Sequence, residues 1–167
     1  DGEYAGVPKE KGKSIVYLSD LDYLSASNTT NSAYPNGQPT TLDHPYNSLS
    51  ELLTLGEMDR VFFKGLGMHP KDPKNPVNGS IDSWTIYDVS ELDCDRFYAA
   101  VGLSNEKGKA GAAKGIIFKV YADYTGNGTY TLLSHSGCID GRESGEFDLD
   151  ITGAKTLKLV SVCAGST

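Results

Sequence analysis

The sequence predicts an all-β protein, an antiparallel β-sandwich formed by a single domain of 167 residues. Short runs of alternating apolar and polar residues recur along the chain, separated by turns rich in glycine, asparagine and proline. The only stretch with helical character, residues 48–55, is short enough to be a single turn or a strand. Strands with one apolar and one polar face are typical of an antiparallel sandwich, whose sheets bury one face each.

The strands follow from local patterns of alternating or β-branched residues. The alternation is clearest where Phe97, Ala99 and Val101 share one face while Arg96 lies on the other. Glycines in the segments 124–130 and 151–157 suit tight hairpin turns. We expect strands at residues 14–18, 60–65, 84–89, 96–102, 115–123, 128–133, 146–151 and 156–162.

Two segments between these strands, residues 25–47 and 70–80, are polar, interrupted by proline and glycine, and too long to be simple connectors. Loops of that length on a rigid sandwich usually carry function or are disordered. No internal repeat or domain boundary is evident, so we expect one module over residues 1–167. Since the chain begins at Asp1 without a signal peptide, we expect it to be a segment excised from a larger protein.

The composition is acidic, with 22 Asp and Glu against 15 Lys and Arg. A net charge of −7 argues against nucleic acid and anionic membranes as partners, because both attract clustered cations. No apolar run is long enough to cross a bilayer, so membrane insertion is not expected. The three cysteines, Cys94, Cys138 and Cys163, match no metal-binding spacing, and their odd number leaves at least one thiol unpaired, with one disulfide possible.

Five blocks of sequence, in this order along the chain, resemble the NPCBM domain, carbohydrate-binding module family 51. The resemblance covers most of the chain, and the fixed order of five blocks makes it specific. The blocks are IVYLSDLDYLSAS, FFKGLGMH, YDVSELDCDRFYAAVGLS, GIIFKVYAD and FDLDITGAKTLKLVSVCAG.

The resemblance implies a jelly-roll sandwich like that of galactose-binding domains, with a sugar site on loops at one end and a structural calcium ion. Such modules belong to secreted bacterial enzymes, chiefly glycoside hydrolases and mucin-directed peptidases. We therefore expect a monomeric, extracellular, non-catalytic module that targets a parent enzyme to terminal galactose of blood-group or mucin glycans. The alternative is a structural spacer or protein-interaction sandwich that has lost its sugar site.

The chain departs from the family pattern in two places. After His69 the family runs almost directly into the next strand, whereas residues 70–80 intervene here. The family also continues beyond the position of Thr167 into a last strand with polar and aromatic residues. We expect the inserted loop to determine the specificity of the site, or its loss.

The predicted sugar site combines one aromatic platform with several hydrogen-bonding side chains. The imidazole of His69 can donate from one nitrogen and accept at the other, which suits a sugar hydroxyl. The sole tryptophan, Trp84, offers a face for sugar C–H groups, and Asp82 beside it can accept from hydroxyls. Arg142 and Glu143 form a donor and acceptor pair that could hold neighbouring hydroxyls, although a solvated loop pair is the simpler interpretation.

For calcium, Asp43 and Asn47 place side-chain oxygens in one loop, and such hard ligands suit this ion. Asp20 and Asp22 compete for the same role. No EF-hand spacing is present.

Catalysis has little support in the sequence, which contains none of the common hydrolase or phosphate-loop motifs. Asp148 and Asp150 could be proposed as a glycosidase pair. Both lie on one side of a regular strand, however, and this is the ordinary solvent face of such a strand. We therefore expect no catalytic residues.

Overall fold

The computed structural model describes residues 13–27, 40–45, 51–70, 82–104 and 115–164, and every structural statement below concerns these ranges. Within them the chain forms strands β1 to β11 and one short 3-10 helix, η2 (Leu18–Asp20). None of the described residues forms a helix of the length and apolar character needed to cross a bilayer. The predicted all-β, antiparallel class is confirmed.

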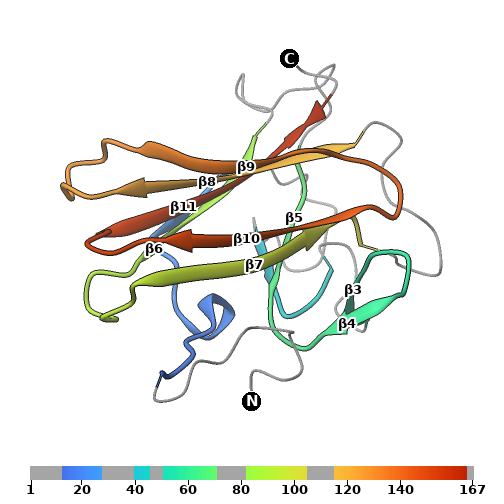
Figure 1. Ribbon diagram of the computed structural model, residues 1–167, viewed down its shortest axis with the longest axis horizontal. Coiled ribbons are helices and arrows are strands. Elements are labelled where there is room, and N and C mark those ends of the chain that lie inside the picture. The colour runs from blue at the N-terminus through green and yellow to red at the C-terminus, as the bar shows by residue number, and fades with distance from the viewer. Residues whose placement is uncertain (1–12, 28–39, 46–50, 71–81, 105–114, 165–167) are drawn as a thin grey trace.

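One layer of the sandwich is a five-stranded sheet in the order β1-β6-β11-β8-β9, with every pair antiparallel. Figure 1 shows β8, β9 and β11 running side by side in this sheet. The long strand β11 lies at its centre, hydrogen-bonded to β6 on one side and β8 on the other. The bounds are β1 (Ser25–Ala26), β6 (Ser83–Asp88), β11 (Thr156–Cys163), β8 (Ile116–Asp123) and β9 (Thr131–Ile139).

The remaining strands form three antiparallel pairs, of which β7 and β10 are the longest. In Figure 1 this pair lies across the middle of the molecule, with the β3–β4 hairpin beyond its right-hand end. The bounds are β7 (Arg96–Gly102), β10 (Ser144–Asp150), β2 (Thr40–Leu42), β5 (Leu66–Met68), β3 (Leu53–Leu55) and β4 (Arg60–Phe62).

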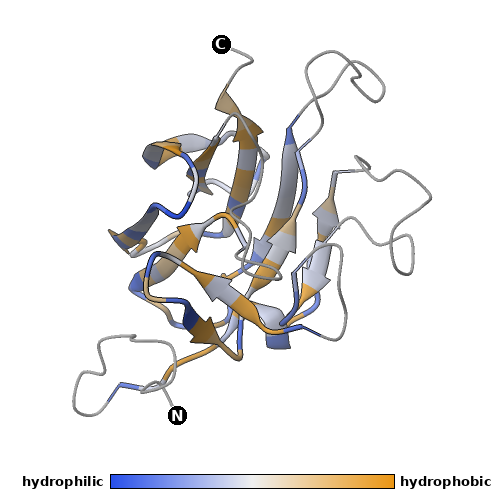
Figure 2. Cartoon of the chain, turned by 90° about the vertical axis from the view of Figure 1, so that its right-hand side faces the viewer, coloured by the Kyte–Doolittle hydropathy of each residue, from blue (hydrophilic) through white to orange (hydrophobic). Residues whose placement is uncertain are grey.

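The core lies between the five-stranded sheet and the β7–β10 pair. Tyr87 and Leu157 from the sheet are almost fully buried, and they belong to one cluster with Phe97 and Phe147 from the pair. Burying aromatic and aliphatic side chains of this size contributes about 1.5–3 kcal/mol each. Orange and pale segments alternate along the strands in Figure 2, as expected when one face of each strand packs inward.

The first predicted strand, residues 14–18, is wrong. Residues 14–17 have no regular structure, and η2 follows them. The edge of β6 pairs instead with β1, where Ser25 lies opposite Ile86. The structure also adds β1, β2 and β5, which the sequence did not indicate. The strand predicted at residues 128–133 is shifted, because β9 begins three residues later and ends six residues later. Residues 48–55, left open between turn and strand, end in β3.

The predicted hairpin after β8 is organised around the carboxylate of Asp123, which is 1 % exposed. Its oxygens accept hydrogen bonds from the amides of Thr125, Gly126 and Gly128 and from the Thr125 hydroxyl, at 2.7–2.9 Å. Both glycines have positive φ, +76° and +85°, which turns their amides toward the carboxylate. Burial raises the pKa of Asp123, but these hydrogen bonds lower it by more, so the pKa lies below its usual value.

We expect Asp123→Ala to lower the Tm by about 5 °C or more, because the amides of a buried turn lose their charged acceptor. Since the folded pKa is depressed, this stabilisation is present above about pH 4 and is lost as the pH falls through the folded pKa. Thermal unfolding followed by circular dichroism between pH 3 and pH 7 measures both effects.

The matched control is Asp150→Ala. Asp150 is exposed and accepts only from the amide and hydroxyl of Thr152, so a smaller shift is expected. Equal shifts for the two variants would show that the Asp123 turn is not an important constraint on the fold.

Candidate functional site

The structure brings the end of β5 and the beginning of β6 to the same end of the sandwich. The Thr85 hydroxyl on β6 lies 2.7 Å from the Thr40 hydroxyl on β2 and 3.5 Å from the sulfur of Met68 on β5. Both threonines are almost fully buried. Because His69 directly follows Met68, these contacts hold the backbone of His69 beside the first residues of β6.

Two of the predicted sugar-binding residues lie on either side of this junction. His69 follows β5 and is exposed, whereas Asp82 precedes β6 and is half-buried. The residues that join them, 71–81, lie outside the described ranges, as does most of the inserted loop. The junction therefore places the backbones of His69 and Asp82 at two strand ends held together by the Thr85 contacts, with Asp82 on the same side of its strand as Trp84.

The interior beneath this junction is polar, which the sequence analysis missed. Ser83 on β6 pairs with Ser161 on β11, and both side chains are at most 1 % exposed. Neither hydroxyl has a hydrogen-bond partner among the described residues. The available signal was the presence of small hydroxyl residues at inward positions of two strands where apolar residues normally stand. This end of the sheet is thus distinct from the apolar core around Tyr87.

Trp84 lies in the same strand, but its side chain points the other way. Strand alternation places Thr85 on the inner face and Trp84 on the outer face of the five-stranded sheet, opposite Val160. The ammonium of Lys158 lies 4.9 Å from the centre of the indole ring. The structure therefore directs Trp84 away from the interior contacts that hold β5.

Arg142 and Glu143 are used in part by contacts within the protein. Arg142 forms an ion pair with Asp59 and donates to the carbonyl of Gly56 at 3.5 Å, both in the turn of the β3–β4 hairpin. Glu143 accepts a hydrogen bond from the amide of Asp140 at 3.1 Å. The Arg142 contacts attach the turn before β10 to the hairpin, whereas the Glu143 contact stays within that turn.

The predicted metal ligand Asp43 is already compensated by a cation. Its carboxylate accepts from the Gly65 amide at 3.0 Å and from the ammonium of Lys64 at 3.3 Å, and Lys64 also pairs with Asp20. Burial raises the pKa of Asp43, but hydrogen bonds from Ser19, Gly65 and Lys64 lower it by more, so the pKa lies below its usual value.

This arrangement fits calcium poorly at Asp43. A lysine ammonium at the carboxylate repels a second cation, and no group of three or more His, Cys, Asp or Glu side chains suited to a metal occurs among the described residues. Asn47, the second predicted ligand, lies outside the described ranges. The calcium ion itself stays a prediction.

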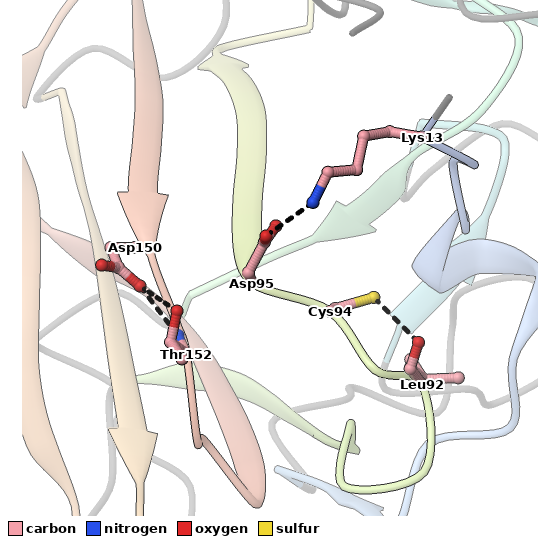
Figure 3. Close-up of polar contacts among 6 residues, drawn as sticks. All are labelled: Lys13, Leu92, Cys94, Asp95, Asp150 and Thr152. Atoms are coloured by element: carbon pink, nitrogen blue, oxygen red, sulfur yellow. Dashed lines mark hydrogen bonds and ion pairs between the residues drawn. The ribbon is translucent and has the colours of Figure 1, made fainter. Parts of the chain in front are cut away.

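Asp148 and Asp150, which the sequence analysis considered and rejected as a glycosidase pair, make structural contacts. Asp148 pairs with Arg96, and Asp150 accepts from Thr152 (Figure 3). The Arg96 hydrogen bond lowers the pKa of Asp148, and the Thr152 hydroxyl lowers that of Asp150. A glycosidase needs one carboxyl with a raised pKa to remain protonated as the general acid, and this pair has none.

Cys94 is not an activated nucleophile. The structure contains no disulfide among Cys94, Cys138 and Cys163. Cys94 donates to the carbonyl of Leu92, just before Asp95 and its ion pair with Lys13 (Figure 3). Burial, together with the neighbouring Asp95 and Asp93, raises the pKa of the Cys94 thiol. A raised pKa reduces the thiolate fraction and therefore the reactivity.

An antiparallel sandwich with polar side chains collected at one strand end has the architecture of a carbohydrate-binding module. The sequence model of the NPCBM/NEW2 domain matches residues 14–166, and the chain belongs to this family, which confirms the resemblance seen in the sequence. No curated protein matches the chain.

Solved structures of family 51 modules share the fold. The chain is 28% identical to CBM51 from Clostridium perfringens GH95, a structure in complex with methyl-galactose, with a TM-score of 0.66 over 91% of this chain and 89% of that one. It is 23% identical to the tandem CBM51 modules of the family 98 glycoside hydrolase from Streptococcus pneumoniae, with a TM-score of 0.66 over 91% of this chain and 42% of that one.

A third similar structure contains CBM51-2, in complex with GlcNAc, and the INT domains of Clostridium perfringens ZmpB. It is 22% identical, with a TM-score of 0.64, and the match covers 89% of this chain but 27% of that one. The chain therefore corresponds to one module within longer multidomain proteins in two of these three structures.

We expect Asp43→Asn to lower the Tm by about 1–3 °C, because the substitution weakens the ion pair with Lys64. The decrease should be equal in calcium chloride and in EDTA, because the substitution does not affect a metal site. Differential scanning fluorimetry in the two buffers measures this. Glu57→Gln removes the same charge at an exposed position that is not among the proposed calcium ligands, and is the control. Destabilisation by Asp43→Asn only in calcium would identify Asp43 as a ligand after all.

Proposed function

We propose that this chain is a non-catalytic carbohydrate-binding module that recognises terminal galactose of blood-group-type or mucin glycans. The observation that carries the proposal is the likeness, at 28% identity over nearly the whole chain, to a family 51 module in complex with methyl-galactose. The two structures at 22% and 23% identity support the fold alone.

The proposed sugar site lies at the junction of β5 and β6. His69 is exposed there, and its imidazole can donate to one sugar hydroxyl and accept from another. The half-buried Asp82 carboxylate is an acceptor at the neighbouring strand end. The buried contact between Thr40 and Thr85 keeps the two strands in place, so the site is preformed and little entropy is lost on binding.

Trp84 is a weaker part of this proposal than His69. Its ring faces the outer side of the sheet, so it contributes to the same site only if the sugar extends around the edge of β6. Arg142 and Glu143 also remain candidates, although both already make contacts within the protein. Calcium, by family resemblance, belongs to the proposal as a structural ion, although the ion pair with Lys64 disfavours Asp43 as its ligand.

The proposed mechanism is mass action. A weak site, with a Kd between about 1 μM and 1 mM, raises the concentration of a linked catalytic domain near its substrate. We place the parent protein outside the cell and in the class of glycoside hydrolases or mucin-directed enzymes, since similar modules occur beside an M60 catalytic domain and in a family 98 glycoside hydrolase.

We expect His69→Ala to weaken binding of methyl galactoside by about tenfold or more, because the sugar loses hydrogen bonds to a positioned imidazole. The Tm should change by less than about 2 °C, since the side chain is exposed. Isothermal titration calorimetry and thermal unfolding measure the two effects.

Met58→Ala is the control, because the Met58 side chain is 93% exposed in the turn between β3 and β4, away from both His69 and the five-stranded sheet. A large fall in Tm for His69→Ala would assign that residue a structural role. Absence of galactoside binding by the folded protein with calcium supplied would favour the alternative, a spacer or protein-interaction sandwich without a sugar site.

A further inference from the structure

The outer face of the five-stranded sheet carries an unusual set of side chains, which the pairing register defines. Cross-strand partners point to the same side, so Trp84, Val160, Lys119 and His135 form one row across β6, β11, β8 and β9. The next row contains Ile86, Lys158, Tyr121 and Leu132. We call the surface formed by these two rows the outer sheet face.

Two lysines on this face, Lys119 and Lys158, form no ion pair with a carboxylate among the described residues. Eight Lys and Arg residues fall in the described ranges, and five of them form ion pairs with Asp or Glu. Within those ranges, the three that form none are Lys119 and Lys158 on the outer sheet face and Lys155 in the turn before β11. Asp88 is exposed on the same side of β6, next to Lys155, so the unpaired positive charge on this face is confined to Lys119 and Lys158.

Lys158 is held in place by aromatic rings. Its ammonium lies 4.9 Å from the ring centre of Trp84 and 5.4 Å from that of Tyr130, and the Tyr130 hydroxyl accepts from Thr156 at 3.4 Å. Two cation–π contacts restrict the long side chain, so less entropy is lost when its N–H groups bind an anion. Tyr121, the cross-strand partner of Lys158, adds a third aromatic side chain to the same face.

Two residues on β9, His135 and Leu132, add a polar and an apolar side chain to this face. The amide of Gly137 donates to Nδ1 of His135 at 3.1 Å, which leaves the proton on Nε2, and the side chain is exposed. Leu132 is 45 % exposed at the end of the second row. The face therefore combines two cations, a hydrogen-bond donor and several ring or aliphatic surfaces.

We propose that the outer sheet face is a second glycan-binding surface, specific for sugars that carry a carboxylate or sulfate group. The anionic group would bind Lys158 and Lys119, while the C–H face of the sugar ring packs on the aromatic side chains. This surface is distinct from the His69 junction, because Trp84 and Thr85 point to opposite faces of β6. The inference does not depend on whether that junction binds galactose.

The test compares three probes of similar size: methyl galactoside, a sulfated galactose and the methyl glycoside of sialic acid. Emission of Trp84, the sole tryptophan, reports binding at the face. We expect at least one of the two anionic probes to bind about fivefold more tightly than the neutral probe at low salt. The preference should disappear near 0.5 M sodium chloride, because salt screens exposed charges.

Lys158→Gln should remove the preference and Lys119→Gln should reduce it, whereas Lys158→Arg keeps the charge and should retain it. Lys13→Gln is the matched control, because Lys13 pairs with Asp95 away from this face. Thermal unfolding of each variant verifies that it is folded. Equal affinities for charged and neutral probes would overturn the proposal, as would a preference that survives the Lys119 and Lys158 double substitution.

The galactose proposal and the proposal of a second surface can be refuted independently of each other. Loss of methyl galactoside binding in His69→Ala concerns only the strand junction, and an anionic preference that persists in this variant supports the outer sheet face. Galactoside binding with no anionic preference would refute the second surface and leave the first intact.

Discussion

The packing of β11 between β6 and β8 is the constraint on which the remaining structure depends. Leu157, Tyr87 and Val120 come from these three strands and are each at most 2 % exposed. Because side chains alternate along a strand, burying these residues determines the face on which every neighbour lies. A slip of one residue would move Lys158 into the core and Leu157 into solvent, at a cost of several kcal/mol. The register thus positions both proposed surfaces.

The two proposed surfaces use the two sides of the same strand, β6. On its inner side, Thr85 contacts Thr40 and Met68, and these contacts hold β5 and the His69 junction. On its outer side, Trp84 receives the ammonium of Lys158. Buried hydroxyl groups therefore lie on the inner side of β6, while aromatic rings and the ammonium of Lys158 lie on its outer side. A module with both could bind a neutral sugar and an anionic one on the same glycan.

Much of the fold was predictable because it is encoded locally. The strand expected at residues 96–102 is β7 without any shift, and the strand expected at residues 84–89 differs from β6 by one residue at each end. The first predicted strand was wrong: a run of suitable residues forms a strand only where a partner strand lies beside it, and the edge strand β6 pairs with β1 instead. The strands β2 and β5, three residues each, are too short for periodicity to reveal them.

The sequence by itself determined the class, the strand pattern, the family and the residue types suited to a sugar, because these depend on local alternation and ordered motifs. Only the tertiary structure decided how the candidates combine. In the folded chain Asp43 pairs with Lys64, and Arg142 pairs with Asp59. The ring of Trp84 faces Lys158, 74 positions later in the sequence, and points away from Met68 and His69. Contacts between residues so distant in sequence depend on sheet order and register, which no local pattern contains.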